Sequence, residues 1–307
     1  MITHYFRTIK DTELKILDNA RTGVWTHVVR PTDEDLTTLV KQYALDEAIL
    51  EDARDFFEVP RLERSQGATY FFTRYPYEEK EEDADTAPLL IVMGESFVVT
   101  ISAREVPQFK GFVGGSVEVH TTQKAKFFIQ IMSAVTQSYE RELVSLRKSV
   151  RKDRAKLRSI GNRDIQRLVD YEHTLNDMIS ALIPTNNWLQ TITDGNYMQL
   201  YNEDVEMMED LMIANSQLVD SARSLLKTIQ NIRSATEAIL TNNLNATIHT
   251  LTIITILLTI PTIISSLYGM NVGLPLMNHP FAFWMVLLFI GLIVLGVGYY
   301  FHKNRWL

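Results

Sequence analysis

The spacing of apolar residues changes twice along the chain, and each change marks a different kind of structure. Up to about residue 116, short β-branched or aromatic runs alternate with polar turns. From about Thr121, apolar residues recur every three or four positions, as on one face of a helix. From about Ile248, two continuous apolar runs follow. This pattern predicts a mixed α/β domain over residues 1–118, a long-helix region over 119–247 and a two-helix membrane domain over 248–307.

The first region contains four runs that predict strands, because they are β-branched or aromatic and end at Gly, Pro or Asp. A helix is expected after Thr32, whose hydroxyl can accept the free N–H groups of a first turn. The acidic stretch 78–85 predicts a solvated loop. Strands mixed with helices indicate an α+β class with an N-terminal α/β domain. The four strand runs are residues 23–29, 70–75, 89–93 and 97–101.

The second region predicts very long helices. Neither Gly nor Pro occurs between Gly195 and Pro261, so one helix is expected over residues 204–268, about 65 residues and therefore about 100 Å long. A preceding helix is expected over 121–183. A helix of this length needs neighbours along its course, either that preceding helix or copies of itself. Its apolar face is formed by Val205, Met208, Leu211, Met212, Leu218, Ala222, Leu225, Leu226, Ile229 and Ile232.

The C-terminal runs, 248–267 and 281–300, match the thickness of a bilayer. Each has about 20 residues, which as a helix rise about 30 Å. No Asp, Glu, Lys or Arg occurs between Ala238 and His302, whereas Lys303 and Arg305 follow directly. Because Lys and Arg favour the cytoplasmic side, we expect both termini there and a multi-pass protein of the plasma membrane. The N-terminus shows no signal-peptide pattern, so the first 230 residues are expected to remain cytoplasmic.

Composition excludes several function classes. The chain has no Cys, which rules out disulfides and thiolate metal sites. It also lacks a G-x-x-x-x-G-K-[ST] segment, an HExxH motif and a Ser/His/Asp signature, so neither an enzyme nor an organic cofactor is predicted. The basic stretch 141–167 fits a solvated helical face better than a nucleic-acid site, and no nucleic-acid partner is expected.

Polar residues form a stripe along the first apolar run at spacings of three, four and seven. Two interpretations remain open from the pattern alone. Small hydroxyls on one side suit a narrow pore, which two spans per chain can enclose only in a symmetric oligomer. Alternatively, the hydroxyls bond to their own helix or hold spans together. The stripe comprises Asn245, Thr252, Thr255, Thr259, Thr262 and Ser266.

The tetrad Tyr268-Gly269-Met270-Asn271, directly after the first span, resembles the signature of the CorA family of magnesium channels. Further resemblance extends over nearly the whole length, and Pro184 resembles a proline at a bend between the family's long helices. One departure is the outer turn 272–280, which lacks the carboxylates that many members carry. The other matching segments are Leu45-Asp46, Glu51-Asp52-Ala53, Pro60-Arg61-Leu62-Glu63, Leu251-Thr252-Ile253-Ile254, Pro261-Thr262 and the ending Lys303-Asn304-Arg305-Trp306-Leu307.

The resemblance implies a homopentamer with a funnel-shaped cytoplasmic domain and a passive, potential-driven Mg²⁺ influx pore. Gly269, Met270 and Asn271 would form the outer mouth and selectivity ring. Lys303 and Arg305 would surround the inner mouth as a basic ring. The implied path runs past Asn245, Ile248, Leu251, Thr255, Thr259 and Thr262, and the stripe adds Thr252 and Ser266.

Regulation by cytoplasmic Mg²⁺ bound between protomers is also implied. Asp210 resembles one ligand by its distance from the signature, with Glu206 nearby and a partner among Asp83, Asp85 and Glu82 of a neighbouring copy. The acidic residues equally suit a helix N-terminus, where negative charge is favourable. Two rival functions remain: transport of Co²⁺, Ni²⁺ or Zn²⁺ by the same fold, and a membrane-anchored sensor or scaffold that does not conduct.

Overall fold

The computed structural model describes residues 1–77, 86–155, 162–194, 197–198, 200–275 and 279–304. The chain divides into two compact units, Met1–Ile232 and Arg233–Leu307. The predicted boundaries at residues 118 and 247 do not coincide with the division between these two units. The three-part division remains a prediction.

The first unit is built on a seven-stranded mixed sheet with the order β2-β1-β3-β7-β6-β5-β4. Neighbouring strands pair antiparallel except β3 and β7, which run parallel with Val24 opposite Phe97. All four predicted strand runs are confirmed, within β3, β5, β6 and β7. The strands are β1 (Ile2–Phe6), β2 (Lys15–Leu17), β3 (Val24–Val29), β4 (Arg61–Ser65), β5 (Ala68–Pro76), β6 (Thr86–Met93) and β7 (Phe97–Ser102).

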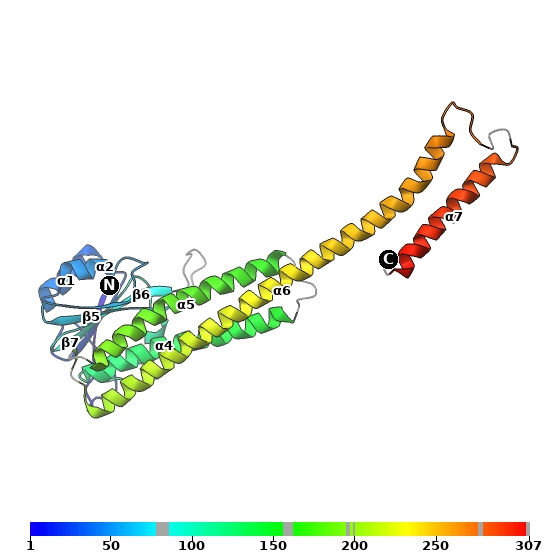
Figure 1. Ribbon diagram of the computed structural model, residues 1–307. Helices are drawn as coiled ribbons and strands as arrows, with labels where there is room; N and C mark the ends of the chain where they lie inside the picture. Colours follow the sequence, from blue (N-terminus) through cyan, green and yellow to red (C-terminus); the bar gives the residue numbers. More distant parts are fainter. Residues whose placement is uncertain (78–85, 156–161, 195–196, 199, 276–278, 305–307) are drawn as a thin grey trace. The chain divides into compact units, whose positions relative to one another are not determined.

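Helices cover both faces of this sheet, as Figure 1 shows. The side chains of successive strand residues point to opposite faces, so Tyr70 and Phe72 contact one helical layer and Phe71 the other. The first layer is α1 (Asp33–Tyr43) and α2 (Glu47–Asp52). The second is η1 (Pro107–Phe109), α3 (Lys110–Val113), α4 (Lys124–Arg154) and α5 (Asn162–Asp194). This arrangement confirms the α+β class.

The predicted helix start at Thr32 is confirmed in atomic detail. Thr32 Oγ1 accepts a hydrogen bond from Asp35 N at 3.2 Å, and Asp35 Oδ2 accepts one from Thr32 N at 3.1 Å. This reciprocal capping satisfies two backbone donors that the helix itself leaves free. The acidic loop predicted at 78–85 lies outside the described residues.

The single helix predicted over residues 121–183 is wrong. Two helices occupy this part of the chain, α4 ending at Arg154 and α5 beginning at Asn162. Apolar spacing cannot distinguish one long helix from two that pack side by side, because both bury the same stripe. Nor does Pro184 mark a bend between helices, since it lies inside α5. Pro184 has no backbone N–H and so cannot make the usual helical hydrogen bond. Burial of Leu182 and Trp188, on either side of it in the sequence, stabilises the helix there.

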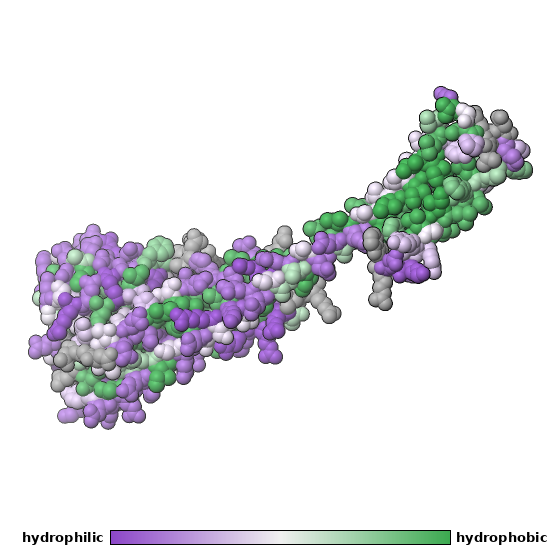
Figure 2. Space-filling view, viewed as in Figure 1, coloured by the Kyte–Doolittle hydropathy of each residue, from purple (hydrophilic) through white to green (hydrophobic). Residues whose placement is uncertain are grey.

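The long helix is confirmed as α6 (Asn202–Tyr268), which has 67 residues and a calculated length of about 100 Å. It begins in the first unit and ends in the second. Within the first unit, Met208, Leu211, Ala222 and Ile229 are buried against the other helices. The second unit contains the rest of α6 and α7 (Ala282–Lys303), and both helices are long and apolar enough to cross a membrane. Figure 2 shows the apolar surface of this unit.

Candidate functional site

The membrane half of α6 has two unlike faces. Helix α7 lies beside it (Figure 1), and on one face Ile253 is only 1 % exposed while Leu257, Ile260 and Ile264 are half-buried. At 100° per residue, the residues of the polar stripe lie roughly 90–170° around the helix from the centre of this face. Consistent with that, every stripe residue is exposed in the single chain. Helix α7 therefore leaves the polar side of α6 uncovered.

Each threonine hydroxyl of the stripe donates to the carbonyl four residues earlier in its own helix. Thr255 Oγ1 lies 2.9 Å from Leu251 O, and Thr259 Oγ1 lies 2.7 Å from Thr255 O. Thr252 and Thr262 make the same contact at 2.9 and 2.8 Å. The own-helix bonding considered from the sequence is thus observed. This bond uses the hydroxyl hydrogen of each of these four threonines, so that only the oxygen lone pairs of their hydroxyls remain to face outward.

The apolar residues expected in the path lie on the same side of α6. Ile248 is 53 % exposed and Leu251 is 63 % exposed. Asn245 precedes them and is also exposed. Exposing these leucine and isoleucine side chains to water is unfavourable. In the functioning protein they must therefore be covered by lipid or by other copies of the chain.

A tight turn follows α6 at Gly269, Met270 and Asn271, the residues predicted to form the outer mouth. Gly269 N donates to Ser265 O at 3.0 Å and to Ser266 O at 3.2 Å, and Met270 N donates to Leu267 O at 3.2 Å. A Cβ built on Gly269 would meet nothing closer than 3.5 Å, and its φ is not in the left-handed region. The protomer itself therefore does not require glycine here. Asn271 follows in an exposed position.

The acidic start of α6 divides into a structural and an exposed part. Asp204 is buried, and its Oδ2 accepts from Tyr201 N at 3.2 Å, which caps the helix start. Glu206 and Asp210 are exposed. Asp210 lines a cavity of about 480 Å³ between α4 and α6, together with Glu140.

The acids at the start of α6 do not complete a metal site with other described residues of the chain. Within the described ranges, no three His, Cys, Asp or Glu side chains are grouped to hold a metal. Asp83 and Asp85, the expected partners of Asp210, lie outside the described residues, and so does Arg305. Lys303 is exposed at the end of α7.

Sequence reasoning missed a buried arginine that organises the edge of the α/β domain. Arg74 is 8 % exposed and donates to Phe56 O at 2.9 Å, Glu58 O at 2.8 Å and Thr86 O at 2.6 Å, and its Nε donates to Thr86 Oγ1 at 2.8 Å. Burial lowers the pKa of Arg74, opposed by nearby anionic and phenolic groups such as Tyr139 and Asp177. The available signal was an arginine inside the aromatic run 70–75.

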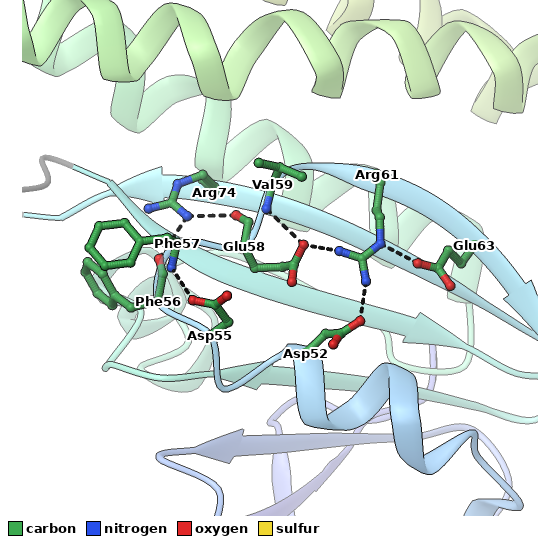
Figure 3. Close-up of polar contacts among 9 residues, drawn as sticks. All are labelled: Asp52, Asp55, Phe56, Phe57, Glu58, Val59, Arg61, Glu63 and Arg74. Carbon is green, nitrogen blue, oxygen red and sulfur yellow. Dashed lines mark hydrogen bonds and ion pairs between the residues drawn. The ribbon is translucent and has the colours of Figure 1, made fainter.

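The neighbouring Arg61 explains one of the matching soluble-domain segments. Its guanidinium pairs with Asp52, Glu58 and Glu63, as Figure 3 shows. These carboxylates come from the end of α2, the following loop and β4. Arg61 and Arg74 together fix the loop between α2 and β4, so this segment has a structural role within the protomer.

Comparison with known proteins matches this architecture over nearly its full length. Residues 21–303 match the model of the family described as CorA-like Mg2+ transporter protein. A cobalt/magnesium transport protein CorA from Methanocaldococcus jannaschii is 24 % identical over 295 residues, covering 92 % of this chain and 91 % of that protein. A magnesium transport protein CorA from Pasteurella multocida is 19 % identical over 300 residues, covering 93 % of this chain and 92 % of that one.

Solved structures agree on the fold. The complete structure of the M. jannaschii CorA magnesium transporter superposes with a TM-score of 0.87 at 22 % identity, covering 100 % of this chain and 99 % of that one. The full-length CmaX protein gives a TM-score of 0.77 at 16 % identity, covering 99 % of this chain and 97 % of that one. Because the family model spans most of the sequence, the chain belongs to the CorA-like Mg²⁺ transporter family.

Proposed function

We propose that this protein is a passive influx channel for divalent cations, mainly Mg²⁺, that works as a homopentamer in the plasma membrane. Residues 1–118 would form its cytoplasmic α/β domain, 119–247 its stalk and 248–307 its membrane domain. The observation that carries the proposal is the position of α7. It packs on the side of α6 that carries Ile253 and leaves the polar stripe exposed. A closed ring of copies with α6 inward would place five such stripes around one axis.

The outward-facing lone pairs of the stripe suit a hydrated cation. Mg²⁺ retains its water shell because it sheds water reluctantly. The hydrogens of those waters point away from the ion and require acceptors. Thr255, Thr259 and Thr262 offer acceptors only, since their hydroxyl hydrogens are bound to α6 carbonyls. A pore lined in this way favours hydrated cations without removing their water.

At the outer mouth we place a ring of Asn271 side chains, with Gly269 and Met270 shaping the turn. An amide oxygen accepts from bound water and carries no charge, so it holds the ion weakly enough for release. In the protomer nothing requires glycine at position 269. Close approach of a neighbouring copy is the requirement that we infer.

At the inner end, Asn245, Ile248 and Leu251 would form a polar ring and an apolar constriction. Thr252 and Ser266 complete the lining at either side of the central threonines. Lys303 and Arg305 would surround the mouth on the cytoplasmic side, where both termini lie. With the inside negative, a divalent cation gains roughly 4.6 kcal/mol per 100 mV, which is enough for influx without ATP.

Regulation would come from Mg²⁺ bound between protomers at Asp210, with Glu206 nearby and Asp83 or Asp85 supplied by the adjacent copy. Asp210 is exposed and no metal-holding group of acids is complete around it in the described part of one chain. Ligands from two copies would make the site depend on assembly. Without the ion, facing carboxylates repel and the ring loosens, which shifts the population toward a conducting state.

A second candidate substrate is Co²⁺, because the M. jannaschii relative is named a cobalt/magnesium transport protein. Ni²⁺ and Zn²⁺ transport are further alternatives within the same fold. The alternative from another class is a membrane-anchored sensor or scaffold that never conducts.

The test is flux through the purified full-length protein in liposomes that contain a Mg²⁺-sensitive dye. With a potential negative inside, we expect dye response within seconds of adding external Mg²⁺, and none in empty liposomes. Competition by Co²⁺ and Ni²⁺ in the same assay ranks the ions. Absence of flux in proteoliposomes that contain assembled, folded protein contradicts the channel and favours the sensor.

A further inference from the structure

A fully buried asparagine lies in the middle of the apolar face by which α6 packs on α5. Asn215 is 0 % exposed, and its Nδ2 donates to Leu182 O of α5 at 3.0 Å. Since a carbonyl can only accept, the nitrogen must face Leu182, which fixes the orientation of the amide. Its Oδ1 is buried and has no hydrogen-bond partner among the described residues.

A second polar contact lies beside it. Asn186 Nδ2 of α5 donates to Ser216 Oγ of α6 at 3.0 Å, and Asn186 Oδ1 is likewise buried without a partner in the described part of the chain. Asn186, Asn215 and Ser216 together form what we call the polar layer. It connects the two helices at the level of Leu182.

The polar layer does not serve stability, because a buried acceptor without a partner disfavours the folded state. A leucine at position 215 would fill similar space without that cost. Buried polar groups in helical interfaces are best known for fixing register. The sequence of α6 supports that role. One turn before and after Asn215, the positions on this face are Leu211 and Val219, both buried and apolar.

Sliding α6 by one turn would therefore break the contact without replacing it. An apolar side chain would face Leu182 O, and the amide of Asn215 would be buried with neither donor nor acceptor satisfied. A penalty of this kind changes a two-state equilibrium by roughly 5- to 150-fold. Only one axial register satisfies the polar layer.

We propose that Asn215 is a positioning residue for ion conduction, which fixes the axial register of α6 on α5. The inference rests on the proposed function, because α6 also carries the polar stripe. Neither Gly nor Pro occurs in α6 before Pro261, so one helix carries both the polar layer and the stripe. A change of register at Asn215 moves the helix by about 5.4 Å per turn.

Cysteine cross-linking measures the register directly, since the chain has no native cysteine. Thr193 Oγ1 of α5 lies 3.4 Å from Met212 Sδ of α6, so the pair Thr193→Cys with Met212→Cys reports the register of this structure. Pairing Thr193→Cys with Met208→Cys or with Ser216→Cys reports a slide of one turn in either direction. Because Ser216→Cys itself removes the Asn186 contact of the polar layer, the rate of that pair is compared only with that of the same pair carrying Asn215→Leu. Each pair is made in the full-length protein with and without Asn215→Leu.

With Asn215→Leu we expect at least one displaced pair to cross-link at least about fivefold faster, relative to the Met212 pair. Leu218→Met, an apolar exchange on the same face, should leave all three rates unchanged. Asn215→Ser keeps a polar group, a hydroxyl in place of the amide, but loses the reach to Leu182 O. It is expected to act like Asn215→Leu and serves if the leucine variant does not fold. Unchanged displaced-pair rates in both variants overturn the register assignment.

Measurements of Mg²⁺ flux distinguish a positioning role of Asn215 from a role in packing alone. In liposomes, Asn215→Leu should shift the internal Mg²⁺ concentration for half-inhibition by at least about threefold while the melting temperature stays equal or rises. A slide of register without any change in flux overturns the role in conduction. If the native chain itself does not conduct, the proposed function fails, and cross-linking still decides the register.

Discussion

The two units of this chain differ in whether their large apolar side chains are buried within the protomer. In the first, aromatic and aliphatic side chains such as Trp25 and Phe71 are fully buried, and a buried cation such as Arg74 finds its acceptors within the same chain. In the second, large apolar side chains such as Ile248 and Leu295 are exposed. The first unit satisfies these groups within the protomer. The second leaves an apolar surface that lipid or other copies of the chain must cover.

The strongest test of this contrast is at the outer turn. Asn271→Ala and Asn271→Asp should each reduce Mg²⁺ flux to background, because one removes the acceptor ring and the other adds one charge per copy, which holds the ion too strongly. The thermal unfolding of the first unit should not change. Liposome flux and circular dichroism on the same samples measure both.

Asn243→Ala is the matched control, since Asn243 is exposed on α6 away from the stripe. It should conduct normally. Normal conduction by both Asn271 variants contradicts the outer ring.

In the first unit, Arg74→Met should destabilise the fold by about 3–5 kcal/mol, because it leaves the buried carbonyl of Thr86 and the half-buried carbonyls of Phe56 and Glu58 without their charged donor. Arg61→Met is the control, as the more exposed Arg61 should matter less. Urea unfolding followed by circular dichroism gives the difference. Equal losses of unfolding free energy in Arg74→Met and Arg61→Met contradict the distinction between the buried and the more exposed arginine.

Low pH should reduce the free energy of unfolding of the first unit, because His27 is harder to protonate in the folded chain. Burial lowers its pKa to about 4, and the contact with Thr100 only partly opposes this. The unfolded chain takes up the proton near its ordinary pKa of about 6.5, whereas the folded chain resists. Stability is therefore full above pH of about 6.5 and falls by about 2–3 kcal/mol as pH drops toward 4.

The measurement is the free energy of unfolding at several pH values, with His27→Gln as comparison. The variant should lose the part of the acid sensitivity that belongs to His27. An identical pH slope in both proteins contradicts the assignment.

Asp210→Asn tests whether the exposed acids of the first unit act only after assembly. We expect the internal Mg²⁺ concentration for half-inhibition to rise about tenfold, as one charged ligand per site is lost. Asp220→Asn, another exposed acid on α6, should leave it unchanged. The readout is flux at stepped internal Mg²⁺, and equal behaviour of both variants removes Asp210 from the regulatory site.

The smallest effect is expected in the stripe. Thr259→Val keeps the shape and removes one acceptor per copy, and should lower flux roughly two- to fivefold. Thr250→Val removes a hydroxyl with the same bond to its own helix, but off the stripe, and should have no effect. Single-channel or liposome flux measures both. Equal effects of the two would show that the hydroxyls matter for the helix and not for the ion.

Much of this molecule was predictable from the chain alone because its signals are local. Strand runs, the cap at Thr32, the unbroken helix to Tyr268 and the charge-free hairpin each follow from residues close in sequence. The stripe was predictable because helical period alone determines which residues share a face.

Tertiary structure decided the rest, because it depends on contacts between distant segments. Only the fold shows that residues 124–154 and 162–194 form two helices and that Arg74 is buried against the loop before β4. The fold also shows that α7 packs on the Ile253 side of α6 and leaves the stripe exposed. Likewise, Asn215 reads in sequence as a polar interruption of an apolar face. Its bond to Leu182, 33 residues away in the chain, gives it a role that no local pattern contains.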